Sequence, residues 1–421
     1  MKIFLFTNFT PTKDNYNGPS AMMYHLFKNR PSDCQVLIFS TNWNHVPSAL
    51  ISDSCRALGT DIRILKDTIF NFFHRRETLQ ELRLKLGIDS SYNISNYRLS
   101  KQALKEIEAF DPDFVWVYGE AHTSVIRQLS KYRLLVAGFD CFALHYNRLM
   151  RDLYCFESPY RYRKILQDYK IALVREIALK DIPCKYYDVG IEDRNMFEIV
   201  TGRSDAVFYP HPHYDVLKKE ICFTNEKLSI LISGKLDQYT WSDSHKLVNA
   251  LCKSARSLAD KFKITFLGKG WVELQKKLEA SGFDVEYKRW VEIYADEVIK
   301  HEIQLFPISV GSGTKGKVLD ALSMGLLCIG SNIAMENIYV KHRHSCYVYK
   351  QVSEIVPILL EVYSDRKRAA QIAINGQEQV LKWHSPKRIF SIICQDVMGV
   401  IEYNGVEEFN KVTGNLQTLL L

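Results

Sequence analysis

Residues 305–338 contain the residue types and spacing best suited to ligand chemistry. An apolar run ending at Pro307 predicts a buried strand, and the glycines of residues 311–313 allow a tight turn after it. The apolar spacing over residues 317–324 then predicts a helix, which Gly325 ends. The first N–H groups of such a helix have no partner within it and lie at the positive end of its dipole. The segment therefore predicts an anion site.

Charged side chains near this helix start indicate which ligand would suit it. Lys315 and Lys317 add positive charge for a phosphate group. Asp320 lies about one turn into the helix, where its carboxylate can accept hydrogen bonds from a neutral polyol such as ribose. The sequence therefore predicts a site for a phosphorylated, sugar-bearing ligand. The alternative is an ordinary strand–helix–strand unit with a glycine turn.

The segment from Gly311 to Gly325, with Glu336 in the stretch that follows, resembles the nucleotide-sugar motif of the GT-B glycosyltransferases. It is most similar to the group 1-like retaining families that build bacterial surface polysaccharides. Many members carry two glutamates eight positions apart, one near the donor sugar and one that binds the ribose. In this chain the two positions hold Ser312 and Asp320. Asp320 keeps the carboxylate, whereas Ser312 departs from the pattern, as in a Gly-Ser-Gly-Thr-Lys subgroup.

Three further places resemble donor contacts of the family. Gly234-Lys235 follows an apolar run, where relatives place a cation on the diphosphate; a solvated lysine in a turn is the alternative. Gly18 lies in a loop like the one that faces the diphosphate, or in a common Gly-Pro turn. Trp290 lies where the family places the nucleobase and could stack on it, although a tryptophan in the core is the alternative.

The segment after the apolar run 133–139 resembles the part of the family that reaches the donor sugar and the reacting hydroxyl. Asp140 and His145 are its candidate catalytic residues, because either could orient or deprotonate an acceptor hydroxyl. Asp140 could instead cap the helix that follows.

Composition limits the class of protein. A chain of 421 residues with 47% hydrophobic and 24% charged residues is typical of a two-domain soluble enzyme. The excess of 55 basic over 48 acidic residues is too mild to indicate nucleic acid, but it permits attraction to an anionic surface. Ten cysteines without a Cys-x-x-Cys pair fit reduced thiols. Because no apolar stretch approaches the roughly 18 residues of a membrane span, we expect a cytoplasmic protein, with peripheral binding to the inner face of the cell membrane left open.

Strand and helix signals alternate along the chain, which predicts parallel sheets with helices on both faces. The predicted strands are residues 2–7, 35–40, 62–65, 114–118, 133–139, 186–189 and 206–209, then 228–233, 263–267, 284–288, 303–306, 326–329 and 346–349.

A proline-rich break separates the two series, and this is the GT-B plan of two Rossmann-like domains that face each other across a cleft. The resemblance implies an acceptor domain over residues 1–212 and a nucleotide-sugar domain over 225–385. In the family, the final segment, here 386–421 with a helix predicted over 387–403, returns to pack on the N-terminal domain.

Two patterns suggest metal ligands, but their context argues against them. Asp111-Pro-Asp113 leads directly into a strand, which indicates a turn. His211 and His213 lie among prolines without an evident third ligand, so we interpret them as structural. GT-B enzymes generally need no tightly held metal, so neither a metal nor another cofactor is expected.

Residues 148–185 carry many arginines and lysines interleaved with tyrosine and phenylalanine. One interpretation is a solvated helical surface. The other is a basic and aromatic face that docks on anionic lipid headgroups or on a lipid-pyrophosphate acceptor.

Together these patterns predict a hexosyltransferase-like enzyme that moves a sugar from a nucleoside-diphosphate sugar, such as a UDP-sugar, to a glycan or lipid-linked acceptor, with retention. A nucleotide-sugar-binding protein without turnover and a nucleotide-sugar epimerase of the same fold are the alternatives. The predicted donor-binding residues are Gly18, Gly234, Lys235, Trp290, Gly311, Ser312, Gly313, Thr314, Lys315, Lys317 and Asp320.

Overall fold

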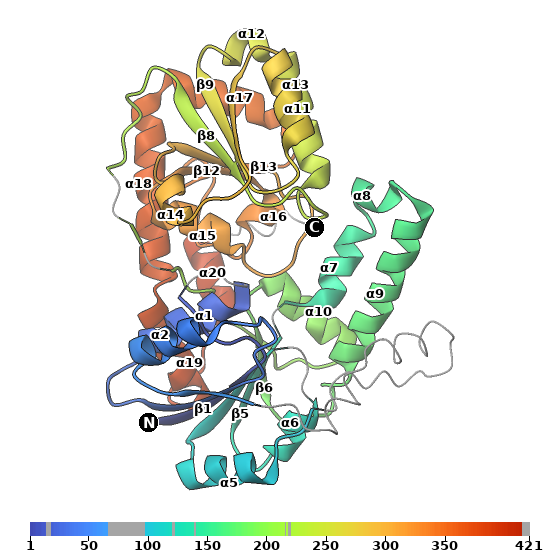
Figure 1. The fold of residues 1–421 in the computed structure, drawn as a ribbon, viewed down its shortest axis with the longest axis vertical. Helices are drawn as coiled ribbons and strands as arrows, with labels where there is room; N and C mark the ends of the chain where they lie inside the picture. The colour runs from blue at the N-terminus through green and yellow to red at the C-terminus, as the bar shows by residue number, and fades with distance from the viewer. Residues whose placement is uncertain are drawn as a thin grey trace. The chain divides into compact units, whose positions relative to one another are not determined.

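The structure is a computed structural model that describes residues 1–13, 18–65, 97–119, 123–138, 140–214, 216–217 and 220–414. The chain divides into two compact units (Figure 1). Unit 1 comprises Met1–Tyr146, Leu166–Pro212 and Pro386–Gly405. Unit 2 comprises Asn147–Ile165, His213–Ser385 and the described residues from Val406 onward.

Unit 1 is built on a parallel sheet whose described strands run in the order β3-β2-β1-β4-β5-β6-β7. The strands are β1 Lys2–Thr7, β2 Gln35–Ser40, β3 Ile62–Ile64, β4 Phe114–Tyr118, β5 Leu134–Ala137, β6 Lys185–Asp188 and β7 Val207–Phe208. The helices are α1 Gly18–Lys28, α2 Ser48–Leu58, α5 Lys101–Phe110, α6 Thr123–Gln128, α10 Ile191–Thr201 and α19 Pro386–Val397, with parts of α7 Phe142–Leu149 and α9 Pro159–Ile177.

Both faces of this sheet are buried, which explains why its strands are continuous apolar runs rather than alternating ones. Ile3 and Leu5 of β1 pack in one layer with α1, α2 and α19. Phe4 and Phe6 point to the opposite layer, which contains residues of α5, α6 and α10. The carboxyl ends of all these strands share one edge of the sheet because every pair is parallel.

Unit 2 repeats this plan with the strand order β10-β9-β8-β11-β12-β13. The strands are β8 Leu228–Ser233, β9 Phe262–Leu267, β10 Asp284–Lys288, β11 Ile303–Phe306, β12 Leu327–Ser331 and β13 Tyr347–Tyr349. The helices are α8 Leu153–Phe156, α11 Trp241–Lys253, α12 Ala255–Leu258, α13 Val272–Ala280, α14 Tyr294–Val298, α15 Gly316–Ser323, α16 Asn332–Met335, α17 Ile355–Ser364, α18 Arg366–Trp383 and α20 Gly405–Thr413, with the 3₁₀ turn η1 Val352–Glu354.

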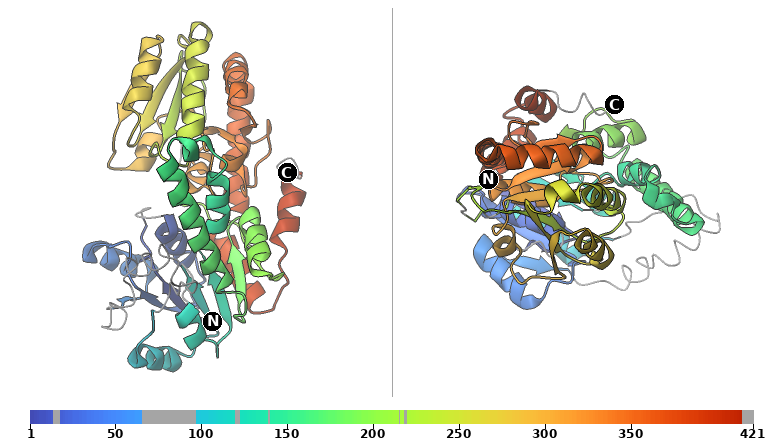
Figure 2. Two further views of the ribbon diagram at one scale, coloured as in Figure 1. Left: turned by 90° about the vertical axis from the view of Figure 1, so that its right-hand side faces the viewer. Right: turned by 90° about the horizontal axis from the view of Figure 1, so that it is seen from above.

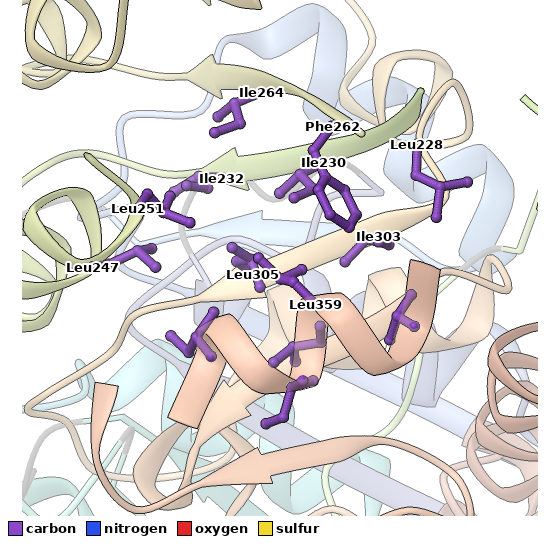
Figure 3. Packing of buried hydrophobic residues seen from close by; sticks show 14 of the residues in the cluster. Leu228, Ile230, Ile232, Leu247, Leu251, Phe262, Ile264, Ile303, Leu305 and Leu359 are labelled. Atoms are coloured by element: carbon purple, nitrogen blue, oxygen red, sulfur yellow. The ribbon is translucent and has the colours of Figure 1, made fainter. Parts of the chain in front are cut away.

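The strands of unit 2 also bury alternate residues in two layers. Ile230 and Ile232 of β8 pack with α11, α13 and α17, and Figure 3 shows Leu247, Leu251 and Leu359 gathered around these strands. Leu231 faces the other layer, which holds residues of α14, α15 and α16. Helix α18 packs along α15 and β12, and two further views show it beside the strands of unit 2 (Figure 2). This packing fixes the strand ends and α15, on which the candidate site is built.

The predicted strands are confirmed, with ends that shift by one or two residues. The glycine-rich turn and its helix α15 also form. The helix ends at Ser323 with Met324 as its C-cap, and Gly325 follows with a φ of 85°. The helix predicted over residues 387–403 ends earlier, at Val397. Its end coincides with Gly399, which has a φ of 75° and lets Val400 N–H donate back to the carbonyl of Gln395.

The boundaries of the units differ from the predicted domains in two places. Residues 147–165 belong with unit 2, because α8 packs on α11 through the rings of Tyr154 and Trp241, whose centroids lie 6.1 Å apart. The last predicted segment divides: α19 packs on α1, whereas α20 packs on Tyr339 of unit 2 through Phe409 and Glu408.

Candidate functional site

The glycine-rich turn of unit 2 connects β11 to α15. Gly313 has a φ of 61°, a left-handed conformation that glycine adopts without steric cost. Lys315 stands at the N-cap of α15 in an extended conformation. The first N–H groups of α15 therefore lie where the turn ends, as expected for an anion site.

A buried ionic cluster of Arg148, Lys315 and Glu336 holds this turn. The Glu336 side chain is only 1% exposed. Arg148 donates two parallel hydrogen bonds to it, from Nη1 to Oε1 at 2.8 Å and from Nη2 to Oε2 at 3.0 Å. Lys315 Nζ donates to Oε1 at 2.8 Å. The sequence places Glu336 in the stretch after the motif, but nothing local indicates that it meets Arg148, which lies 188 positions earlier.

The ends of β8 and β9 form a second glycine-lined surface next to α15. Gly234 and Gly268 have φ values of 119° and 127°. A Cβ atom on Gly268 would lie 2.1 Å from the Gly234 carbonyl oxygen, so the two backbones approach too closely for a side chain. A Cβ atom on Gly234 would lie 3.0 Å from Lys317 Nζ. The ammonium of Lys317 therefore lies directly against the backbone at the end of β8.

Two lysines flank this surface. Lys235 follows Gly234, and its side chain is exposed. Part of the Lys317 side chain is also exposed, yet the protein around its ammonium desolvates the charge and lowers its pKa, while Asp237 and Asp320 act in the opposite direction. The sequence thus brings two cations to one strand end, an arrangement suited to a diphosphate.

Asp320 is the buried carboxylate of the site, with 9% of its surface exposed. Burial raises the pKa of Asp320 to about 7, and the charge of Lys317 partly opposes this shift. Two nearby tyrosines have raised pKa values. Burial is the main cause for both Tyr214 and Tyr294, and it raises the pKa of Tyr294 to about 12. The negative charge of Asp320 adds to both shifts. Asp320 can therefore change its protonation state near neutral pH.

A polar network includes Tyr294, on which the charge of this carboxylate acts. Ser233 and Tyr294 share a hydrogen bond of 2.8 Å between their hydroxyls, and Gln304 Nε2 donates to Ser233 Oγ at 2.7 Å. Gln304 is fully buried in β11. The network joins the end of β8 to the interior of β11 and to α14. Sequence reasoning missed it, although a glutamine inside an otherwise apolar strand was a signal.

Trp290 lies after β10 and is 75% exposed, so it is not a core tryptophan. It stands beyond the carboxyl end of a parallel strand, at the same edge as Gly234 and Gly268. Its indole face is thus available for stacking, and its contact with a nucleobase stays a prediction.

The remaining predicted residues lie in unit 1. Gly18 begins α1. Asp140 follows β5 half-buried, and His145 lies in α7 with 3% of its surface exposed. Two buried carboxylates hold the start of α7: Asp193 Oδ1 accepts from Cys141 N–H at 3.0 Å, and Glu176 Oε1 accepts from Ala143 N–H at 3.0 Å. Burial raises the pKa of Glu176 to about 7.

The residues that could suggest metal ligands have structural roles. Asp111 ends α5 with a φ of 52°, and Asp113 Oδ2 accepts from the backbone N–H of Lys2 at 2.7 Å, so both aspartates act in the predicted turn. His211 Nδ1 lies 2.7 Å from the carbonyl oxygen of Pro212. The backbone N–H of His213 donates to the backbone carbonyl of His384. In the described residues, no group of three or more His, Cys, Asp or Glu side chains could hold a metal ion. Within the same residues, no helix is long and apolar enough to cross a membrane.

Comparison with known proteins shows the fold. No protein-family model matches the sequence, and no curated protein is similar to it. Among solved structures, HepE from Anabaena in complex with UDP superposes with a TM-score of 0.60 at 11% identity, covering 95% of this chain and 100% of HepE. The chain has the GT-B fold.

Two further structures are similar over nearly their whole length. Sucrose-phosphate synthase from Thermosynechococcus elongatus gives a TM-score of 0.62 at 12% identity, covering 95% of this chain and 99% of the synthase. The lipopolysaccharide outer core galactosyltransferase WaaB gives a TM-score of 0.53 at 11% identity, covering 95% of this chain and 100% of WaaB. At such identities the likeness is one of fold, so the function has to be argued from the site.

Proposed function

We propose that this chain is a glycosyltransferase that moves a sugar from a nucleoside-diphosphate sugar to a glycan or lipid-linked acceptor, with retention of anomeric configuration. The observation that carries the proposal is that Lys317 Nζ lies against Gly234, the residue before Lys235, while the charges of Lys317 and Asp320 act on each other in unit 2. Cations beside open backbone suit a diphosphate, and a carboxylate about one turn into the following helix suits ribose hydroxyls.

The donor would use each of these groups for a different part of the molecule. Lys235 and Lys317 contact the diphosphate, and the N–H groups at the start of α15 add to their field. Asp320 accepts hydrogen bonds from the ribose, and Trp290 stacks on the base. Uridine is the base we favour, because the structure of HepE, which has the same fold, contains UDP.

The chemistry follows from charge stabilisation on the leaving group. The bond between the anomeric carbon and the diphosphate breaks, and its electron pair stays on the phosphate oxygen, which the cations and backbone N–H groups stabilise. The acceptor hydroxyl attacks from the same face, and its proton passes to the departing phosphate oxygen. In unit 1, Asp140 and His145 orient the acceptor. Because this scheme assigns the leaving-group charge to lysines and amides, we expect EDTA to leave transfer nearly intact.

Assays with a panel of UDP- and GDP-sugars test this proposal against the two alternatives. A glycosyltransferase releases nucleoside diphosphate by transfer or slow hydrolysis. Ser312, which replaces a carboxylate of related enzymes, is the observation that favours a binding protein, and such a protein would bind donors but release nothing. An epimerase would interconvert two donors without releasing nucleotide. Activity lost with EDTA and restored by Mn²⁺ would contradict the metal-free scheme.

We also propose that the start of α9 and the neighbouring α8 dock on an anionic lipid surface, which would bring the enzyme to a lipid-linked acceptor. The support is a set of exposed apolar side chains, Leu153 at 56%, Phe156 at 63% and Tyr160 at 77%. Exposed basic side chains at Arg151, Arg163 and Lys164 accompany them. Aromatic residues that enter the headgroup region, together with cations that meet anionic lipids, are the usual pairing at a membrane interface.

A further inference from the structure

Three consecutive carbonyl groups of the glycine-rich turn point at cations. Arg148 Nη1 donates to the carbonyl of Gly311 at 2.7 Å. Lys315 Nζ donates to the carbonyls of Ser312 at 3.0 Å and Gly313 at 2.8 Å. The same two cations bind the buried carboxylate of Glu336. The turn is therefore held from one side by an ionic cluster, which we call the Glu336 cluster and which consists of Arg148, Lys315 and Glu336.

The direction of these carbonyls fixes the direction of the N–H groups that follow them. In a trans peptide the C=O of one residue and the N–H of the next point in opposite directions. With the carbonyls of residues 311–313 turned toward the Glu336 cluster, the N–H groups of residues 312–314 point away from it. Successive N–H groups that face the same way, with a left-handed residue such as Gly313 among them, make a concave anion site.

The ammonium group of Lys315 uses its hydrogen-bond donors within the turn and this cluster. An ammonium group has three N–H donors. Lys315 Nζ has three acceptors at hydrogen-bond distance, namely the carbonyls of Ser312 and Gly313 and the carboxylate of Glu336. Its side chain is 12% exposed. A phosphate could reach Lys315 only by displacing one of these acceptors, whereas Lys235 and Lys317 lie at the strand-end surface.

We propose that Arg148, Lys315 and Glu336 are positioning residues that hold the turn with its N–H groups directed at the donor diphosphate. This inference rests on the proposed donor site and adds the side chains that shape it. Lys315 then acts through the turn rather than by contact with the donor. Glu336 is essential to the arrangement, because it brings Arg148 and Lys315 together and neutralises one of their two charges.

Glu336→Gln separates positioning from simple electrostatics. If the cluster contributed only charge, removing a carboxylate beside an anion site would strengthen UDP binding. If the cluster positions the turn, the amide loses the paired hydrogen bonds with Arg148, the turn loosens, and UDP binding weakens by about tenfold. Arg148→Met should weaken UDP binding at least as much. Arg148→Lys should be intermediate, since lysine keeps the positive charge but cannot make the two parallel hydrogen bonds of the guanidinium.

Calorimetric titration of UDP, GDP and uridine into the full chain tests the inference. Arg256→Met is the matched control, because Arg256 is an exposed arginine on α12 of the same unit. We expect the cluster variants to lose UDP affinity, uridine to bind wild type and variants alike, and the control to match wild type. Because uridine lacks phosphates, its unchanged binding also shows that a variant is folded. Lys315→Met serves if Arg148→Met does not fold.

The outcomes separate this inference from the function on which it rests. A wild-type chain that binds neither UDP nor GDP overturns the proposed function and this inference with it. A wild-type chain that binds UDP, with cluster variants within twofold of it, overturns the inference alone. Stronger UDP binding by Glu336→Gln, or equal losses for UDP and uridine, would also overturn it.

Discussion

Lys317 Nζ lies 3.0 Å from the position that a Cβ atom would take on Gly234. The ammonium from the start of α15 thus rests on bare backbone at the end of β8, and any side chain at residue 234 would meet it. Gly234 also has a φ of 119°, a conformation that favours glycine. This contact brings Lys317, from the start of α15, to the end of β8, where Lys235 follows Gly234. The two lysines form the proposed diphosphate site.

Gly234→Ala should therefore lower both stability and nucleotide affinity. The backbone strain costs about 1–3 kcal/mol of the free energy of unfolding. Displacement of Lys317 should weaken UDP binding by about tenfold, as the loss of a charge-assisted hydrogen bond does. Gly282→Ala is the control, because Gly282 has a φ of 94° with open space around it. It should lose similar stability and keep wild-type UDP affinity; equal affinities for the two variants would remove Gly234 from the site.

Asp320 should make nucleotide binding depend on pH near neutrality. The pKa of Asp320 is raised to about 7 in the folded protein, and only the ionised carboxylate accepts from both ribose hydroxyls. UDP affinity should therefore rise between about pH 6 and about pH 8. Asp320→Asn should lower the affinity and remove this rise, apart from the part due to the phosphate of UDP, which titrates with a pKa of about 6. Titrations of both proteins at three pH values measure the difference.

The raised pKa of Asp320 should also make stability depend on pH, in the opposite direction to UDP affinity. A folded pKa above the unfolded value of about 3.9 means that the folded state binds more protons between the two values. The contribution of Asp320 to stability should therefore fall as the pH rises from about 4 to about 7. Glu176 should act in the same direction, because its folded pKa is also raised to about 7. Thermal unfolding of Asp320→Asn should depend less on pH than that of wild type; an equal dependence would refute the assignment.

Ser312 and Asp320 should affect different steps. By the motif resemblance, Ser312 takes the place of a carboxylate near the donor sugar, so we predict that Ser312→Ala leaves UDP affinity unchanged and lowers kcat. Asp320→Ala should raise the dissociation constants for both UDP and the whole donor. If Ser312→Ala changes neither quantity, the backbone of the turn makes the sugar contact. If Asp320→Ala leaves UDP affinity unchanged, the assignment of the ribose contact is wrong.

The exposed aromatic face should bind anionic membranes. Replacing Phe156 and Tyr160 together by serine should reduce co-sedimentation with vesicles that contain phosphatidylglycerol, and high salt should reduce binding of the wild type. Ile199→Ser is the control, because Ile199 is 78% exposed on α10. Wild-type binding that is equal for neutral and anionic vesicles, or lost equally in the control, would argue against a lipid partner for this face.

The fold was largely predictable from the sequence, because strands buried on both faces leave apolar runs that need no knowledge of their partners. The turn at residues 311–315 was equally visible, since glycine spacing and helix signals are local. The role of Arg148 was not, because it meets the carbonyl of Gly311 across 163 positions of sequence. Trp290 was ambiguous for a related reason: a tryptophan carries no local sign of whether tertiary packing covers it, and here 75% of it is exposed.

The central claim is that unit 2 binds a nucleoside diphosphate through Lys235 and Lys317, and one titration tests it most directly. UDP and GDP are titrated into wild type, the double variant Lys235→Ala/Lys317→Met, and Lys276→Ala as a control for an exposed lysine on α13. We predict that wild type and control bind at least one nucleotide with equal affinity, and that the double variant binds it about a hundredfold more weakly, as loss of two charge-assisted contacts implies. Equal affinity of the double variant and the wild type would contradict the account.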